Sequence, residues 1–252
     1  MAGLWINLWY KNSPMYKRLP LLLAACSLAS VAIAAEPVAP QPFSAVYDLE
    51  WRGVGAGSST LDLVRVGGNE YTFRSSNVAR GFFRFAFPNP ITQTTRFLIE
   101  DGKVRPMAYR ADDGSAKTDR DIDLKFDWQA MRAKGITENK PVDAEIRPGT
   151  QDGLSVQISL MMALAAGQSP DHFLLFDKTE TKDYRYTREG NATLDTPLGK
   201  LDTVVYRSDR EGSSRVTRMW LAPSMGYLPA QAEQLRNGRR EFMLRLRSVS
   251  RH

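Results

Sequence analysis

Residues 119–128 read DRDIDLKFDW, and polar and apolar side chains alternate along this run. Successive side chains of a β-strand point to opposite faces of a sheet, so the alternation predicts a strand with one solvated face and one buried face. The predicted solvated face carries Asp119, Asp121, Asp123, Lys125 and Asp127, and the predicted buried face carries Arg120, Ile122, Leu124, Phe126 and Trp128. We expect arginines on neighbouring strands to pair with the acidic row, although such a row could also hold calcium or supply catalytic carboxylates.

The same alternation continues on both sides of this run and predicts a series of antiparallel strands. They are expected at residues 43–51, 58–66, 71–77, 91–100, 104–111, 119–128, 201–209, 215–221, 226–235 and 241–249. Between them, Gly67-Gly68-Asn69, Asp101-Gly102 and Asn237-Gly238 supply residues that tolerate positive φ, as tight hairpin turns require. We expect a single β-rich domain over residues 43–250.

One helix is expected, at residues 153–166. The pattern from Leu154 to Leu160 also fits a strand, but the ends favour a helix, because Asp152 can cap the first turn and Gly167 suits the left-handed position after the last turn. A helix this apolar must be buried, so the predicted fold is mainly β: a curved antiparallel sheet or half-open barrel with one apolar α-helix packed on its concave face. Candidate ligand contacts on the helix are Leu154, Ile158, Met161 and Met162, with ordinary core packing as the alternative.

A second unusual stretch lies at residues 80–90, where aromatic residues are flanked by arginines and followed by prolines. Its aromatic residues are Phe82, Phe83, Phe85 and Phe87. In a loop these rings would form an apolar lip with basic edges that contacts lipid or an acyl chain. The alternative is that the rings fill the mouth of the sheet or lie between its layers.

The N-terminal 34 residues have the composition of an export signal. Lys17 and Arg18 precede an apolar stretch, and the small residues around Ala32-Ile33-Ala34 fit signal peptidase cleavage before Ala35 or Glu36. Met15 is a plausible true start, and residues 35–42 form a Pro/Ala-rich spacer. The apolar stretch is short for a membrane-spanning helix, so no retained transmembrane helix is expected.

Cys26 suggests a second way in which the same N-terminal signal could be processed. The sequence Leu23-Ala24-Ala25-Cys26 fits a lipobox, in which the cysteine is acylated and becomes the first residue of a lipoprotein. The apolar stretch continues past Cys26, as in an ordinary cleaved signal. The predicted location is therefore the periplasm, with an outer-membrane lipoprotein anchored through Cys26 as the alternative.

Composition excludes several classes of function. The chain has 34 basic and 28 acidic residues, and removing the leader with Lys11, Lys17 and Arg18 leaves 31 against 28, so the net charge falls from +6 to +3. Basic residues alternate with acidic ones along the domain, so no nucleic-acid partner is predicted. The only cysteine lies in the leader, and the only histidines are His172 and His252, so we predict no metal site and no cofactor. No phosphate-binding glycine loop or nucleophile elbow is present, and His172 is expected to be a surface residue in a turn rather than a catalytic base.

Several segments together carry a resemblance to a known family. They read TPLGKLDTV at 196–204, RVTRMWLAP at 215–223, GYLPA at 226–230 and DGLS at 152–155, with further matches at 47–57 and 102–109. They resemble an exported bacterial family, the domain of unknown function 3108 (DUF3108), over residues 43–250. These motifs are turns and core positions, so the resemblance implies a fold and no catalytic residue. The strand order with one inserted helix is also similar to lipoprotein carriers such as LolA and LolB, at the level of fold.

We therefore expect a non-enzymatic periplasmic protein that binds an apolar or lipidic ligand in cell-envelope maintenance. The main alternative is a structural protein whose sheet surface binds an envelope protein partner. A third hypothesis is a carboxylate-dependent hydrolase that uses Asp119 and Asp121.

Overall fold

The computed structural model describes residues 39–115 and 118–251. The predicted export signal and Cys26 lie outside these residues. Within the described ranges, no helix combines the length and apolar character needed to cross a membrane.

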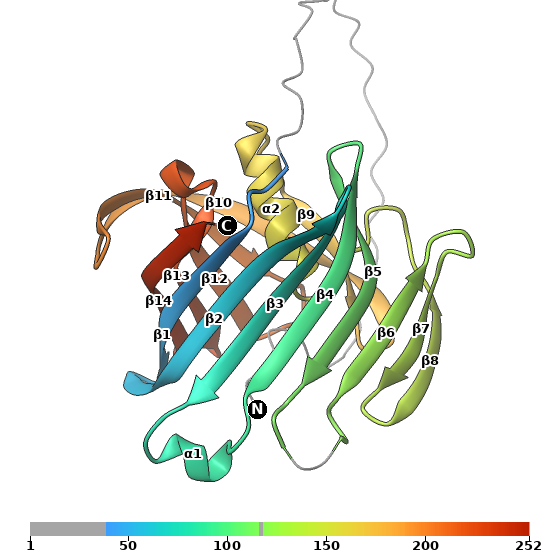
Figure 1. The fold of residues 1–252 in the computed structure, drawn as a ribbon, viewed down its shortest axis with the longest axis horizontal. Helices are drawn as coiled ribbons and strands as arrows, with labels where there is room; N and C mark the ends of the chain where they lie inside the picture. Colours follow the sequence, from blue (N-terminus) through green and yellow to red (C-terminus); the bar gives the residue numbers. More distant parts are fainter. Residues whose placement is uncertain (1–38, 116–117, 252) are drawn as a thin grey trace, which may run out of the picture.

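A single antiparallel sheet of 14 strands makes up most of the domain (Figure 1). Its strand order is β8-β7-β6-β5-β4-β3-β2-β1-β14-β13-β12-β11-β10-β9, so each half of the chain forms its own meander. The first half contains β1 (Phe43–Trp51), β2 (Val54–Gly67), β3 (Glu70–Ala79), β4 (Ile91–Glu100), β5 (Lys103–Asp112), β6 (Ile122–Asp127), β7 (Arg132–Thr137) and β8 (Lys140–Glu145). The second half contains β9 (His172–Asp177), β10 (Glu180–Thr196), β11 (Gly199–Asp209), β12 (Arg215–Ala222), β13 (Leu228–Arg236) and β14 (Arg239–Arg251).

Pairing of β1 with β14 joins the two meanders into one curved sheet. The register places Phe43 opposite Arg251 and Trp51 opposite Phe242. The free edges, β8 and β9, do not pair directly: Gln151 instead forms a bridge to Leu175 of β9, and Lys178 Nζ lies 2.5 Å from Glu138 Oε1. The sheet is therefore curved but is not closed into a barrel.

The core lies between the concave face of the sheet and α2 (Ser155–Ala165), which sits between the two halves of the curved sheet (Figure 1). Ile158 and Leu160 of α2 are fully buried, as are Phe43, Phe73 and Phe97 of the sheet. α2 is apolar on all sides, which suits a helix enclosed by a sheet. The predicted fold class is confirmed.

Asp152 connects the start of α2 to the sheet. Its Oδ1 accepts hydrogen bonds from the backbone amides of Leu154 and Ser155, each at 2.8 Å, and its Oδ2 accepts one from the hydroxyl of Thr95 on β4 at 2.6 Å. Asp152 is 1% exposed, and burial raises the pKa of its carboxyl group. At the other end Gly167 has a φ of 73°, so both predicted ends of the helix are confirmed within two residues.

All the predicted strands are present, and most of the differences are at their ends. The run at 119–128 gives a shorter strand, β6, because Asp121 is still in a turn whose amide bonds to Thr118. β13 begins at Leu228 rather than 226, since Gly226 and Tyr227 have φ values of 69° and 61°. Four strands, β7 to β10, were not predicted, and neither were the short helix α1 (Phe83–Ala86) and the 3-10 turn η1 (Pro223–Met225).

Candidate functional site

A cavity of about 130 Å³ lies between the concave face of the sheet and α2. Both meanders contribute to its wall, so it exists only because β1 pairs with β14. The apolar part of the lining comes from Leu61, Leu154, Val156, Leu160, Leu175, Met219, Ala232 and Leu244. Several of these side chains are among the most buried in the domain, with Leu160 at 0% and Leu175 at 2% exposure, so this part forms the inner end.

Part of the polar lining is buried among the apolar side chains (Ser59, Ser75, Asn77, Gln93 and Ser208), and the rest reaches the surface. Tyr184 of β10, Arg210 and Ser213 of the β11–β12 turn, and Arg215 of β12 all contribute, and each is only partly buried. Burial, followed by the charge of Asp177, raises the pKa of Tyr184 to about 12. The Tyr184 hydroxyl therefore stays protonated at neutral pH and can donate a hydrogen bond at the mouth of the cavity.

Some polar atoms of the lining have unused hydrogen-bonding capacity. Among the described residues, Ser59 Oγ, Gln157 Nε2 and Arg210 Nε are buried and have no hydrogen-bond partner. Ser59 is 1% exposed. Buried polar groups are nearly always satisfied by protein, water or ligand, so a bound molecule or ordered water can complete these sites.

Of the four helix residues predicted to contact a ligand, only one lines this cavity. Leu154 lines it, whereas Ile158, Met161 and Met162 belong to the hydrophobic core at 0%, 4% and 6% exposure and are not part of the lining. Neighbouring helical residues face different directions, and the sequence pattern of an all-round apolar helix does not reveal which face meets a cavity.

The phenylalanine segment forms α1, at the end of the sheet where the β1–β2 and β3–β4 connections lie (Figure 1). Phe82 and Phe85 are 80% and 87% exposed, and Phe83 and Phe87 are partly buried. The ring of Phe83 packs edge-on against Trp51 with centroids 5.8 Å apart. We call Trp51, Phe82, Phe83 and Phe85 the aromatic surface; it lies outside the cavity lining.

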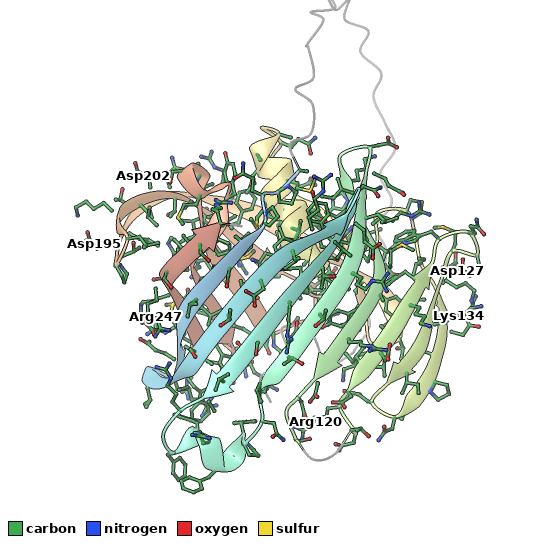
Figure 2. All side chains as sticks on the ribbon, viewed as in Figure 1. Arg120, Asp127, Lys134, Asp195, Asp202 and Arg247 are labelled. Atoms are coloured by element: carbon green, nitrogen blue, oxygen red, sulfur yellow. The ribbon has the colours of Figure 1, made fainter. Side chains whose placement is uncertain are left out.

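Asp123, Lys125 and Asp127 form a solvated face of β6, as predicted, but Asp119 and Asp121 precede the strand, and Arg120, which was expected on the buried face, is exposed in the turn. Asp123 pairs with Arg110 of the neighbouring β5 at 3.0 Å and is 51% exposed, and Figure 2 shows Asp127 projecting from the outer edge of the sheet. Asp119 is exposed in the turn before β6. The structure therefore does not place Asp119 and Asp121 side by side on one strand face.

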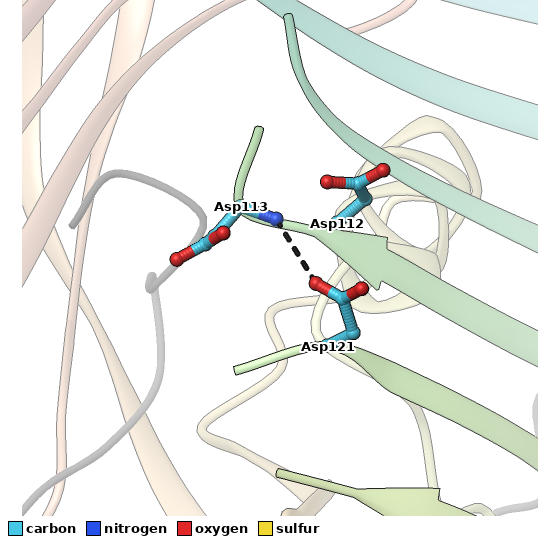
Figure 3. Close-up of side chains that lie close together, drawn as sticks. All are labelled: Asp112, Asp113 and Asp121. Carbon is cyan, nitrogen blue, oxygen red and sulfur yellow. Dashed lines mark hydrogen bonds between the residues drawn. The ribbon is translucent and has the colours of Figure 1, made fainter. Parts of the chain in front are cut away.

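A different acidic group, Asp112, Asp113 and Asp121, brings carboxylate oxygens within 4.8 Å of one another (Figure 3). Asp113 also lies 3.7 Å from Arg120, and Asp112 and Asp113 accept hydrogen bonds from the backbone amides of Gly114 and Ser115. Burial, followed by the charges of Asp112, Asp113 and Asp119, raises the pKa of Asp121. Because these carboxylates accept hydrogen bonds from nearby backbone amides, the group stabilises the chain that follows β5.

His172 is exposed, as expected, but is the first residue of β9 rather than part of a turn. Its Nδ1 lies 2.7 Å from Asp171 Oδ1, and that carboxylate is 89% exposed. No serine is among the described partners of this pair, so a catalytic triad is not assembled there.

Sequence reasoning missed Tyr184, Arg210 and Arg215. Arg215 did carry a signal, because it alternates with Thr217, Met219 and Leu221 on one face of a predicted strand, and Leu221 is fully buried. An arginine on the inward face of a strand indicates a buried charge that needs a partner. Arg210 and Tyr184 are in a turn and in an unpredicted strand, where no pattern indicates which way they point.

The fold and the cavity define a β-barrel-like protein in which an open, curved sheet encloses one apolar helix. The chain matches the family model described as a protein of unknown function (DUF3108) over residues 46–245, and it belongs to this family. It is also similar to the crystal structure of a β-barrel-like protein of domain of unknown function DUF1849 from Brucella abortus, with a TM-score of 0.54 and 13% identity, covering 85% of this chain and 99% of that chain.

A protein with a YmcC-like fold from Bacteroides fragilis gives a TM-score of 0.38 and 11% identity, covering 84% of this chain and 96% of that chain. Curated proteins give no match. The predicted family is thus confirmed, and the match to the Brucella abortus structure supports the fold alone.

Proposed function

We propose that this chain is exported to the periplasm and that its single domain, residues 43–250, binds an apolar or lipidic molecule without chemically changing it. The cavity between the sheet and α2 is the observation that carries this proposal. Buried aliphatic side chains from both meanders make up much of its lining, so an apolar group packed against them is removed from water.

The size of the cavity limits what it holds. At about 130 Å³ it is similar to an engineered apolar cavity of ~150 Å³ that binds benzene, and it is below the ~300–1,000 Å³ of pockets for drug-sized ligands. The occupant is therefore a small molecule, or one end of a longer chain whose remainder extends through the polar mouth.

A cavity-filling substitution tests the proposal. Wild-type protein isolated from its own envelope is expected to carry an apolar small molecule in native mass spectrometry. Ala232→Phe places a ring in the cavity and should abolish that mass, with Ala232→Leu as a milder version. Ala130→Phe is the matched control, because Ala130 is exposed on the β6–β7 turn. An empty wild-type domain with a stoichiometric protein partner would refute ligand binding.

The proposed periplasmic location is inferred from the N-terminal export signal, and a separate experiment tests it. Metabolic labelling with a fatty-acid precursor is expected to leave the protein unlabelled, because the apolar stretch continues beyond Cys26. Labelling that disappears in Cys26→Ala would instead show a lipoprotein anchored in the outer membrane.

The aromatic surface supports a second candidate function, the binding of an envelope component at the surface of the protein. The exposed rings of Phe82 and Phe85 lie 6.1 Å apart, and Phe82 also lies 6.5 Å from the partly buried Phe83. Clusters of exposed apolar side chains are characteristic of interaction sites. The double variant Phe82→Ser/Phe85→Ser should then lose envelope function while remaining folded. Val66→Ser removes an apolar side chain that is 61% exposed at the other end of β2, and it should have no effect.

A further inference from the structure

All the charged side chains that line the cavity are positive. Arg210 and Arg215 both contribute guanidinium groups, and no aspartate or glutamate is among the described residues that line it. We infer that the ligand is an anionic amphiphile, whose carboxylate or phosphate group binds Arg210 and Arg215 while its apolar part enters the cavity. This inference rests on the proposed function and adds the chemical class of the ligand.

The two arginines lie on either side of one turn. Arg210 directly follows β11 and Arg215 begins β12, and both act electrostatically on the phenol of Tyr184. The guanidinium carbon of Arg210 is 5.9 Å from the centre of the Tyr184 ring. An anion at this end of the cavity therefore meets two guanidinium groups and a protonated hydroxyl, which are strong donors for carboxylate and phosphate oxygens.

Neighbouring arginines form direct ion pairs with a carboxylate, whereas Asp177 acts on Arg210 without such a contact. Arg185 and Arg207 both pair with Asp209, at 2.8 and 2.6 Å. Among the described residues, Arg210 forms no ion pair with a carboxylate, and its Nε is buried without a hydrogen-bond partner. An anionic ligand would supply the direct ion pair that the Arg210 guanidinium lacks and a hydrogen-bond acceptor for its buried Nε.

Two acidic groups, Asp177 and Glu241, act electrostatically on this pair, and each also has another cationic partner. Asp177 lies 3.2 Å from Lys182, and Glu241 lies 3.6 Å from Arg52. Burial, followed by the charge of Arg236, lowers the pKa of Arg215, while Glu241 and Asp177 act in the opposite direction. The positive potential at the mouth is thus only partly offset by the protein, and a cleft with one sign of charge concentrates ligands of the opposite sign.

Two ligands with the same apolar chain, one charged and one neutral, measure how much the charge contributes to binding. Octanoate and 1-octanol have the same chain length, and only octanoate is ionised at pH 7. Isothermal titration calorimetry of the purified domain should give at least tenfold tighter binding of octanoate. Arg210→Gln and Arg215→Gln should each weaken octanoate binding about tenfold and leave octanol binding unchanged. Arg215→Lys should restore part of the affinity.

Arg247→Gln is the control, because Arg247 is a surface arginine on β14 that pairs with Asp48 at 3.3 Å (Figure 2). Near-ultraviolet circular dichroism establishes that each variant is folded. Equal affinities of the wild type for octanoate and octanol, or an equal effect of Arg247→Gln, would overturn the anionic ligand while leaving the apolar cavity intact. Failure of both ligands to bind would overturn the inference and the proposed function together.

Discussion

At the scale of single residues, Gly57 shows how closely neighbouring strands approach. A Cβ atom built on Gly57 would lie 2.0 Å from the backbone oxygen of Val78 on β3, whereas one on Gly55 would meet nothing within 4 Å. Gly57→Ala must therefore push β2 and β3 apart, and we expect it to lower the free energy of unfolding by about 1–3 kcal/mol. Gly55→Ala in the same strand should change it by less than about 0.5 kcal/mol. Urea denaturation of both variants measures the difference.

Asp177 should make stability depend on pH. Burial raises its pKa from 3.8 to about 6, despite the opposing charge of Lys182. The native state therefore binds more protons than the unfolded state between these values, so stability falls as pH rises from about 4 to about 7. The difference corresponds to about 3 kcal/mol.

Asp177→Asn removes this titration, so its urea midpoint should change less than that of the wild type between pH 4 and pH 7. Asp152 titrates in the same direction but is present in both proteins, so the comparison isolates Asp177. Parallel pH profiles for the two proteins would contradict the prediction.

At the scale of elements, the start of α2 is the connection that holds helix and sheet together. Asp152→Ala leaves the amides of Leu154 and Ser155 and the hydroxyl of Thr95 without their acceptor inside the protein. We expect a loss of about 2 kcal/mol or more in the free energy of unfolding. Asp127→Ala also removes a carboxylate that accepts a backbone amide, from Ala130, but in an exposed turn. Its effect on the urea midpoint should be much smaller.

Elements with a regular pattern and clear ends could be predicted from the sequence, and the others could not. β1 and β4 were predicted at their observed bounds because buried and exposed side chains alternate along them. β10 is 17 residues long but has a single buried residue, Tyr186, so it lacks the apolar side that identifies a strand. β7 contains Gly135, at which a side chain would meet the backbone of β6, and this close approach interrupts the pattern.

The candidate site was harder to predict than the fold. Its residues come from α2 and from strands of both meanders, which are far apart in the sequence and meet through the pairing of β1 with β14. Local patterns report which side of an element is apolar, but they do not report which elements become neighbours. The charge of the cavity mouth is therefore a property of the assembled sheet.

At the scale of the whole molecule, the two ends of the domain lie side by side. Phe43 is paired with Arg251, so a short Gly/Ser linker can join them. New ends between Pro197 and Leu198 would fall in the exposed β10–β11 turn. This circular permutant should unfold cooperatively at nearly the wild-type temperature. New ends between Asp152 and Gly153 should instead prevent folding, because they separate α2 from its capping residue; circular dichroism melts distinguish the two.

The pairing of β1 with β14 also sets the order of events when the protein is made. Chains emerge from the N-terminus onward, and contacts between residues far apart in sequence form slowly. The first meander can assemble as soon as it emerges, but β1 keeps one open edge until the 13 residues of β14 arrive. During that interval the concave face is unprotected, so the last strand to emerge determines how long the nascent chain is exposed to aggregation.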